Sequence, residues 1–325
     1  MNHAAPALLT PVSLAAACKA AGDPLRMNIL KLLGQGAFGV LELSQIFGIK
    51  QSGMSHHLKV MAQAGIVSAQ REGNSIFYRR PFVAGQDSFS QWLRETFRVL
   101  DRLPLDADVM QGVTRVLGER GQACADFFAR HADDFREQQD LIASHEQYGQ
   151  ALETLLATLN PASTDAALEI GPGEGAFLKP LSQRFTQVTA VDISPDMLSK
   201  AGAFCAQEQL SNVRLIAGDT AALLKEGKGN YDFAVANMVL HHVPSPKTIF
   251  AEVASLLKPG GSFLVTDLIH HDQEWARTAC GDLWLGFEPA DLSQWAQDAG
   301  LSEGESQYSG LRNGFQIQFR LFHRS

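Results

Sequence analysis

The sequence has 325 residues, of which 45% are hydrophobic and 19% are charged. This balance is typical of folded proteins and excludes a wholly disordered chain, and the length predicts two domains. The formal net charge of −8 alone argues against a polyanionic partner, but residues 1–80 contain eight Lys and Arg against three Asp and Glu. The net charge of residues 1–80 is +5, which leaves −13 for the rest of the chain. The N-terminal part is therefore expected to attract phosphate groups and the remainder to repel them.

The four cysteines lie far apart and form no Cys-x-x-Cys pair, which favours a reducing compartment over a disulfide framework. We therefore expect no thiolate metal site. No stretch approaches the ~20 apolar residues that cross a bilayer, and residues 14–18 lack the charged and apolar regions that precede a secretory cleavage site. These features predict a cytoplasmic protein with no membrane partner.

Helical periodicity begins near Val12, pauses, and resumes at Asp23, where Asp23 and Pro24 supply an N-cap and a first-turn proline. A short helix is predicted over residues 40–47 and a second over residues 51–64, each followed by a glycine. Two short helices around a tight turn predict a helix-turn-helix.

Two strand-like runs follow, over residues 66–70 and 75–79, and the loop between them contains Gly73. This hairpin predicts the wing of a winged helix-turn-helix. The second helix of such a motif enters the major groove, and its first turns meet the base edges. We expect base contacts from Gln51, Ser52, Ser55 and His56.

Basic side chains near the motif are expected to contact phosphates, which fix the register without reading the sequence. These are Lys59, Arg71, Arg79 and Arg80, with Asn74 at the wing tip against the DNA backbone or the minor groove. A winged helix that serves only protein contacts stays an alternative. The segregation of positive charge with the motif favours duplex DNA.

The order of Asp23-Pro24-Leu25-Arg26, residues 41–48, Ser55-His56-His57-Leu58-Lys59 and Arg71-Glu72-Gly73-Asn74 resembles the ArsR family of bacterial repressors over residues 14–80. That resemblance implies a homodimer. The stretch that carries paired cysteines in many metal-sensing relatives has none here, and His56 and His57 point about 100° apart on a helix. We therefore expect no metal sensing by this motif.

Residues 87–159 are predicted to be almost wholly helical, with breaks near Pro104 and Gly121. We interpret this region as dimer-forming and connecting helices. The predicted domains are a winged helix-turn-helix over residues 1–82, a helical connector over 83–145 and a ligand-binding domain over 146–325.

From Ala166 the spacing of hydrophobic residues changes, and predicted strands alternate with predicted helices. This order predicts an α/β domain with a parallel sheet and right-handed crossovers. The predicted strands are residues 167–170, 187–192, 213–217, 231–237 and 261–268. The run Leu-Glu-Ile-Gly-Pro-Gly-Glu-Gly over residues 168–175 ends the first strand and opens a helix. Its glycines let the backbone approach a ligand that side chains would exclude.

Glycines alone are a weak signal, but Asp192 ends the second strand about twenty residues later, where a carboxylate accepts from ribose hydroxyls. Asp219 is expected to meet an adenine amino group, and Ile193 and Met197 to cover the adenine faces. Residues 237–243 are expected beside a transferable methyl group. The expected ligand-binding residues are Glu169, Gly171, Gly173, Gly175, Asp192, Ile193, Met197, Gly218, Asp219, Asn237 and Met238. Two alternatives stay open: the glycines serve only a tight turn, or the site binds NAD.

Together with Lys258-Pro259-Gly260-Gly261, this combination resembles class I S-adenosylmethionine-dependent methyltransferases, which are Rossmann-like α/β proteins, over residues 145–325. The resemblance implies S-adenosylmethionine or S-adenosylhomocysteine as the cofactor. Such enzymes act largely by alignment, sometimes with one general base. The candidates for a base or a substrate contact are His241, His242, Asp267, His270 and His271, each of which also fits a purely structural role. Trp275, Trp284 and Phe287 are candidates for an apolar pocket wall.

A DNA reader joined to a metabolite-binding fold predicts a switch, in which the ligand prefers one conformation and so changes the affinity for an operator. The fusion resembles the SahR-like branch of ArsR repressors, which implies a sensor of S-adenosylhomocysteine that controls methionine-cycle genes. The alternative is an active methyltransferase for a small molecule, regulated or localised by its winged helix.

Overall fold

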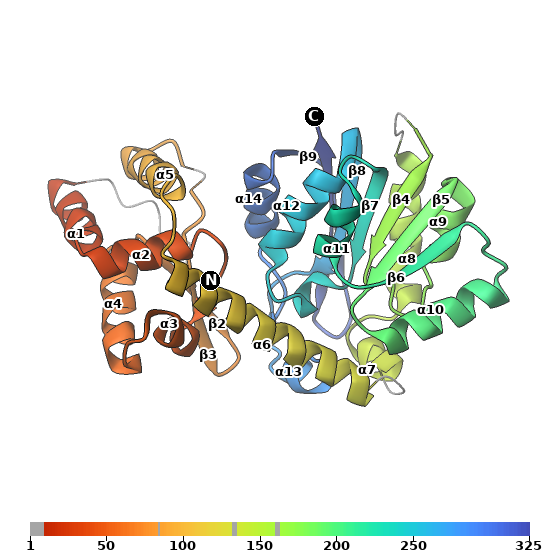
Figure 1. The fold of residues 1–325 in the computed structure, drawn as a ribbon, viewed down its shortest axis with the longest axis horizontal. Helices are drawn as coiled ribbons and strands as arrows, with labels where there is room; N and C mark the ends of the chain where they lie inside the picture. Colours follow the sequence, from red (N-terminus) through yellow and green to blue (C-terminus); the bar gives the residue numbers. More distant parts are fainter. Residues whose placement is uncertain (1–9, 84, 132–134, 160–162) are drawn as a thin grey trace. The chain divides into compact units, whose positions relative to one another are not determined.

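The computed structural model describes residues 10–83, 85–131, 135–159 and 163–325. The chain divides into two units, Met1–Glu119 and Arg120–Ser325 (Figure 1). Within the described ranges, no helix is both long and apolar enough to span a membrane. The predicted fold class, a helical winged helix-turn-helix followed by a Rossmann-like α/β domain, is confirmed.

The first unit begins with α1 (Pro11–Ala21) and α2 (Pro24–Leu32), and the Asp23 side chain caps α2 by accepting from the Arg26 amide. The helix-turn-helix consists of α3 (Val40–Phe47) and α4 (Gln51–Gln63). Gly48, which ends α3, has a φ of 64°, a conformation that glycine adopts without a steric cost. The unit continues through α5 (Ser88–Asp101) into α6 (Ala107–His131).

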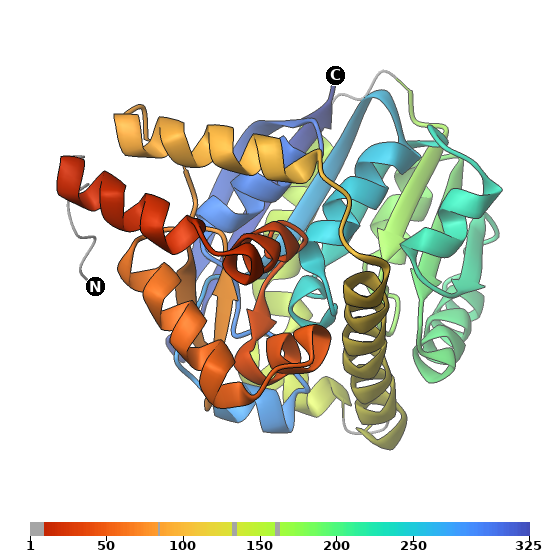
Figure 2. The same ribbon diagram turned by 60° about the vertical axis from the view of Figure 1, so that its left-hand side comes forward.

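The wing is a three-stranded antiparallel sheet in the order β1-β3-β2, made of β1 (Phe38–Gly39), β2 (Ser68–Glu72) and β3 (Ser75–Arg79). Gly73 lies in the turn between β2 and β3 with a φ of 60°. The helices meet in a single cluster of buried side chains that includes Leu30, Leu43 and Leu58. Figure 2 brings the helices of this unit forward.

The second unit contains a seven-stranded sheet in the order β6-β5-β4-β7-β8-β10-β9. Its strands are β4 (Ala166–Ile170), β5 (Gln187–Asp192), β6 (Val213–Ala217), β7 (Tyr231–Asn237), β8 (Leu257–Leu268), β9 (Leu301–Gly310) and β10 (Gln316–Arg324). The first five are parallel, and β10 is antiparallel to both β8 and β9. The strand order reverses between β4 and β7, which is where open α/β sheets bind their ligands.

Helices cover both faces of this sheet. The unit contains α7 (Phe135–Ile142), α8 (His145–Thr158), α9 (Leu178–Arg184), α10 (Pro195–Gln207), α11 (Thr220–Glu226), α12 (Pro246–Leu256), α13 (Trp275–Ala279) and α14 (Pro289–Asp298). Right-handed crossovers place α9 and α12 on opposite faces, because the two connections run in opposite directions from the centre of the sheet (Figure 1). Side chains of α8 and α9 pack on residues of β4, β5 and β7 in one buried cluster.

Several features differ from the sequence prediction. Helix α6 runs through Gly121 without the expected break, and a Cβ at Gly121 would lie 3.6 Å from the ring of Pro244. The antiparallel hairpin of β9 and β10 was not predicted, since β9 is exposed along nearly its whole length and shows no alternation of apolar residues. Strand β8 begins at Leu257 rather than Gly261.

Candidate functional site

The glycine turn after β4 is built from residues in left-handed backbone conformations. Gly171, Gly173 and Gly175 have φ values of 63°, 55° and 91°. A Cβ on Gly171 would lie 2.4 Å from Cγ2 of Val239, and one on Gly175 would lie 3.3 Å from the Ala201 backbone. At Gly173 a Cβ would meet no described atom within 4 Å. The positive φ favours glycine at all three positions, a Cβ on Gly171 would also clash with Val239, and Gly173 borders open space.

Glu169, the penultimate residue of β4, is 1% exposed, and its Oε2 has no hydrogen-bond partner among the residues that the structure describes. Burial raises the pKa of this carboxyl group to about 8. A buried polar atom without a partner is rare in folded proteins and marks a position where a ligand donor is expected. Glu169 thus fits an ammonium or amide group of a bound molecule.

Asp192 ends β5, and its Oδ1 accepts from the amide of Ser194 at 2.8 Å. Burial raises the pKa of Asp192 to about 6, although the backbone amides of Ser194 and Ile193 act in the opposite direction. The Asp192 carbonyl oxygen accepts from the Gly218 amide at 2.9 Å, which joins the end of β5 to the end of β6. The acid and the two strand ends therefore form one edge.

The residues that were expected around adenine differ in their surroundings. Ile193 is 44% exposed, whereas Met197 is 2% exposed in the core. Asp219 caps α11, since its Oδ1 accepts from the Ala222 amide at 2.9 Å. Gly218 has a φ of 149°. An adenine contact by Asp219 therefore has to coexist with its capping bond.

At the end of β7, Met238 adopts a φ of 51°, which is uncommon for a residue with a side chain. Its amide donates to the carbonyl of Thr266 at 2.8 Å, so the neighbouring strand holds the strained residue in place. The preceding Asn237 has a buried Oδ1 without a partner in the described part of the chain. Strain and an unpaired polar atom at one strand end are typical of a binding site.

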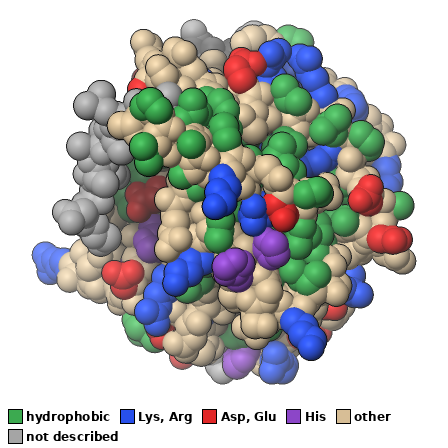
Figure 3. Space-filling model, turned by 90° about the vertical axis from the view of Figure 1, so that its left-hand side faces the viewer, with side chains coloured by type: hydrophobic (Ala, Val, Ile, Leu, Met, Phe, Trp, Pro, Cys, Tyr) green, Lys and Arg blue, Asp and Glu red, His purple; other side chains and the backbone are tan. Residues whose placement is uncertain are grey.

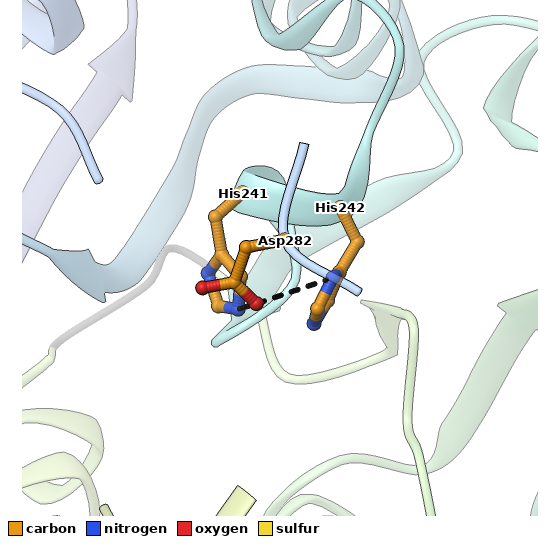
Figure 4. Close-up of side chains that lie close together, drawn as sticks. All are labelled: His241, His242 and Asp282. Carbon is orange, nitrogen blue, oxygen red and sulfur yellow. Dashed lines mark ion pairs between the residues drawn. The ribbon is translucent and has the colours of Figure 1, made fainter. Parts of the chain in front are cut away.

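A buried cluster of histidines and carboxylates follows β7. Nδ1 of His241 lies 2.8 Å from Oδ1 of Asp267, whose Oδ2 accepts from the Leu240 amide at 3.0 Å. Nε2 of His241 lies 3.9 Å from Oδ1 of Asp282, and Nδ1 of His242 lies 3.8 Å from the same oxygen (Figure 4). Both histidines were predicted as candidates, but Asp282 was not, because it lies in a loop some forty residues away with no periodic signal.

The charges of this cluster shift the two histidines in opposite directions. Burial lowers the pKa of His241, but the carboxylates of Asp267 and Asp282 outweigh it and raise the pKa above its usual value. Burial and the neighbouring His241 lower the pKa of His242 well below its usual value. The adjacent imidazoles therefore differ, one stabilised as a cation and one as a neutral ring.

The remaining side chains expected near the crevice mostly pack against protein. His271 lies edge-on to Phe315 at 4.7 Å between ring centroids, and burial lowers its pKa to about 4. Nε2 of His270 is buried with no partner among the described residues. Trp284 donates its indole N–H to the carbonyl of Val243 at 2.8 Å, while Phe287 packs on Trp295. Trp275 is 38% exposed.

In the first unit, α4 presents one polar face and one apolar face. Gln51, Ser52, Ser55, His56 and Lys59 are exposed, while Met54, Leu58 and Met61 are fully buried. On the wing, Arg71 and Asn74 are exposed and Arg79 is half-buried. Figure 3 looks onto the side of the molecule where α1–α4 lie, and Lys, Arg and His side chains gather near the centre of that view.

Arg80 differs from the sequence expectation of a phosphate contact. Its guanidinium pairs with Asp101 at 2.7 Å and donates from Nε to the carbonyl of Leu30 at 2.8 Å. The group also lies 4.6 Å from the ring centre of Phe97, and the side chain is only 12% exposed. Arg80 therefore joins α2 to α5 instead of facing solvent.

Comparison with known proteins agrees with this division of the chain. Residues 168–265 match the family described as a methyltransferase domain, and residues 21–68 match a helix-turn-helix domain. A Ubiquinone biosynthesis O-methyltransferase of Xanthomonas axonopodis pv. citri is 29% identical over 163 residues, which are 46% of this chain and 67% of that protein. A second such enzyme, from Xanthomonas euvesicatoria, is covered over 61% of its length, so the chain spans less than two thirds of some of these relatives.

An uncharacterised methyltransferase of Mycobacterium bovis is 31% identical over 185 residues, which cover 53% of this chain and 90% of that protein. Among solved structures, magnesium protoporphyrin IX methyltransferase from Synechocystis, determined with bound S-adenosylhomocysteine, has a TM-score of 0.52 and 19% identity. That likeness covers 63% of this chain and all of the other. It establishes a shared fold for the second unit.

Proposed function

The chain belongs to the methyltransferase family through its second unit, and we propose that it is an ArsR-type transcription regulator that senses an adenosyl nucleoside. One observation carries the proposal: a single chain combines a helix-turn-helix whose second helix has a polar, exposed face with a sheet edge where buried polar atoms of the described residues lack hydrogen-bond partners. A catalytic domain alone has no use for such a helix.

The proposed DNA contacts follow from the exposure of α4. Gln51, Ser52, Ser55 and His56 lie on its first two turns and read base edges in the major groove. Lys59, Arg71, Asn74 and Arg79 contact the DNA backbone and hold the register. Two copies of the chain form a homodimer that binds an operator with two half-sites, in keeping with the ArsR resemblance. This role places the protein in the cytoplasm.

The proposed ligand is S-adenosylmethionine or S-adenosylhomocysteine. Asp192 accepts from the ribose hydroxyls, and the turn at Gly171–Gly175 admits the chain of the amino acid moiety. Glu169 offers its unpaired Oε2 to a donor, such as the ammonium group of that moiety. Ile193, Met197, Gly218 and Asp219 border the base, and Asn237 and Met238 border the sulfur. S-adenosylmethionine would supply a transferable methyl group when bound.

Regulation requires the ligand to prefer one of two conformations that differ in operator affinity. The SahR-like resemblance suggests S-adenosylhomocysteine as the effector and methionine-cycle genes as the targets. The test is a calorimetric titration of the full chain with each nucleoside, repeated in the presence of operator DNA. We expect the affinity for one nucleoside to change at least fivefold when DNA is bound, since coupling energies of about 1–3 kcal/mol are typical.

A second candidate function is methyl transfer to a small molecule. The names of the curated relatives favour it, and so does the His241–Asp267 pair, which resembles a positioned base. Turnover of a labelled methyl donor separates the candidates. Methylation of a metabolite with DNA affinity indifferent to both nucleosides would reject the sensor, whereas coupled binding without turnover would reject the enzyme.

A further inference from the structure

Three buried side chains converge beside the end of β7 with their ligand atoms within 4.8 Å of one another. His241 and His242 belong to the short 3₁₀ helix Leu240–His242, and Asp282 lies in the loop that follows α13 (Figure 4). The Asp282 side chain is fully buried, and so is that of His241. The cluster therefore lies inside the protein and is not a chance approach of surface groups.

The two distances to Asp282 are too long for hydrogen bonds. Nδ1–H of His242 donates instead to the carbonyl oxygen of Gly281 at 3.3 Å, a bond that a metal ion on Nδ1 would replace. Oδ1 of Asp282 lies 3.9 Å from Nε2 of His241 and 3.8 Å from Nδ1 of His242. Two atoms that each lie about 2.0–2.1 Å from one Zn²⁺ at a tetrahedral angle are roughly 3.4 Å apart. The two distances to Asp282 exceed that spacing by about 0.5 Å, and the remaining pair of ligand atoms lies within 4.8 Å.

Several atoms of the cluster lack a partner. Among the described residues, neither carboxylate oxygen of Asp282 makes a hydrogen bond. Nε2 of His241 makes none with these residues either. A buried carboxylate without hydrogen bonds is costly, and removal of its charge or binding of a cation relieves that cost. A bound cation would satisfy both residues at once.

The surroundings orient His241 as a ligand. Its Nδ1–H donates to Asp267, and its Nε2 faces Asp282, where a metal ion would have to displace the Nε2 proton of the cationic ring. Asp267 is itself fixed by the amides of Leu240 and Leu268 at 3.0 and 2.7 Å. A carboxylate behind a metal-binding histidine is the arrangement that sets the tautomer and raises the basicity of the ring.

We propose that His241, His242 and Asp282 bind a divalent transition-metal ion, with Asp267 as the carboxylate that orients His241. Two imidazole nitrogens and one carboxylate oxygen suit Zn²⁺ and its neighbours in the first transition row, whereas Mg²⁺ and Ca²⁺ prefer oxygen ligands alone. Three protein ligands leave at least one coordination position for water or another small oxygen donor. The site goes beyond the proposed function and is tested without either nucleoside.

The experiment uses the full chain, free of any affinity tag and stripped of metal, titrated with Co²⁺ and followed by visible absorption. We expect one Co²⁺ per chain, with d–d bands and no thiolate charge transfer, and displacement by Zn²⁺. Asp267→Asn is expected to weaken Co²⁺ binding by about 10–100-fold, and Asp282→Asn by more than that. The matched control is His323→Gln, because His323 hydrogen-bonds to Ser262 away from the cluster and its loss should leave binding unchanged.

Thermal melting covers the possibility that a variant folds poorly. Zn²⁺ is expected to raise the Tm of the parent and of His323→Gln but not that of Asp282→Asn or His242→Gln. The proposal is overturned if the parent binds no Co²⁺ saturably. It is also overturned if Asp282→Asn and His242→Gln retain the parent's affinity, or if His323→Gln loses as much as they do.

Discussion

The amide of Gly218 donates to the carbonyl oxygen of Asp192 at 2.9 Å, so the backbone after β6 is tied to the acid that ends β5. The Asp192 side chain accepts a hydrogen bond from the Ser194 amide, and it can also accept from a ligand at this edge of the sheet. The Gly218 amide therefore fixes the backbone of Asp192, and the Ser194 amide, just before α10, fixes its carboxylate.

Replacement of Asp192 tests the proposed ribose contact. We expect Asp192→Ala to weaken nucleoside binding at least roughly 100-fold, since two hydrogen bonds to a charged group contribute about 1.5–3 kcal/mol each. Calorimetry with S-adenosylhomocysteine measures this change, and DNA binding without ligand should not alter. The control is Asp196→Ala, an exposed carboxylate on the following helix. Unchanged ligand affinity in Asp192→Ala would place the pocket elsewhere.

The pKa of Asp192, raised to about 6, predicts how nucleoside affinity depends on pH. The ionised carboxylate accepts from the ribose, so binding has to remove the proton that the free protein carries below pH 6. Through this group, affinity should therefore fall by up to about tenfold per unit below pH 6. Asp192→Asn should lose this dependence, and a parent profile flat to pH 5 would contradict the prediction.

Glu169 predicts a pH dependence of stability. Its folded pKa of about 8 exceeds the ordinary value of 4.5, so the folded state binds the proton more tightly than the unfolded state. The contribution to stability is present at low pH and is lost as the pH rises toward 8. Glu169→Gln should therefore gain stability over the parent by up to about 1.4 kcal/mol per pH unit between pH 5.5 and 8. Urea unfolding at both pH values measures the difference, and a gain independent of pH would contradict it.

Lys59 tests the DNA contact of α4. Lys59→Ala should weaken binding to all duplex sequences and reduce the slope of log affinity against log salt by about 0.9, because one phosphate contact is lost. Gel-shift titrations at several salt concentrations measure both quantities. Lys225→Ala, an exposed lysine of α11, is the control. An equal effect of the two substitutions would argue against a specific role for α4.

Arg80 should behave as a structural residue. Its bonds to Asp101 and to the Leu30 carbonyl predict that Arg80→Ala destabilises the first unit by about 1.5–3 kcal/mol, measured by urea unfolding. Arg98→Ala is the control, because the pair of Arg98 with Glu95 is largely exposed and should contribute little. A shallower salt dependence of DNA binding in Arg80→Ala, without loss of stability, would restore the phosphate role.

The fold was largely predictable because its signals are local. Caps such as Asp23, the glycine turn at Gly171–Gly175 and the alternation of strands and helices each depend on neighbouring residues. The break expected at Gly121 was wrong, because a glycine inside a helix lowers helix propensity by only about 1 kcal/mol and does not by itself end a helix. The exposed strand β9 has no apolar alternation from which to predict it.

The site was predictable only where it follows the strands. Asp192 and Asn237 end strands, so the topology of a parallel sheet brings them to one edge. Asp282 lies in an irregular loop, and its approach to His241 depends on how α13 and the adjacent segments pack. Arg80 was misassigned for a similar reason, since its partner Asp101 is twenty-one residues away on α5.

The carboxylate of Asp267 accepts from the amides of Leu240 and Leu268 and from the ring of His241. The backbone around Asp267 is thus ordered when the chain folds, before any small molecule arrives. The conformational entropy of this segment is lost during folding and not during ligand binding, which favours a higher affinity. A molecule that binds beside the end of β7 therefore meets residues that are already ordered, and its binding does not have to order them.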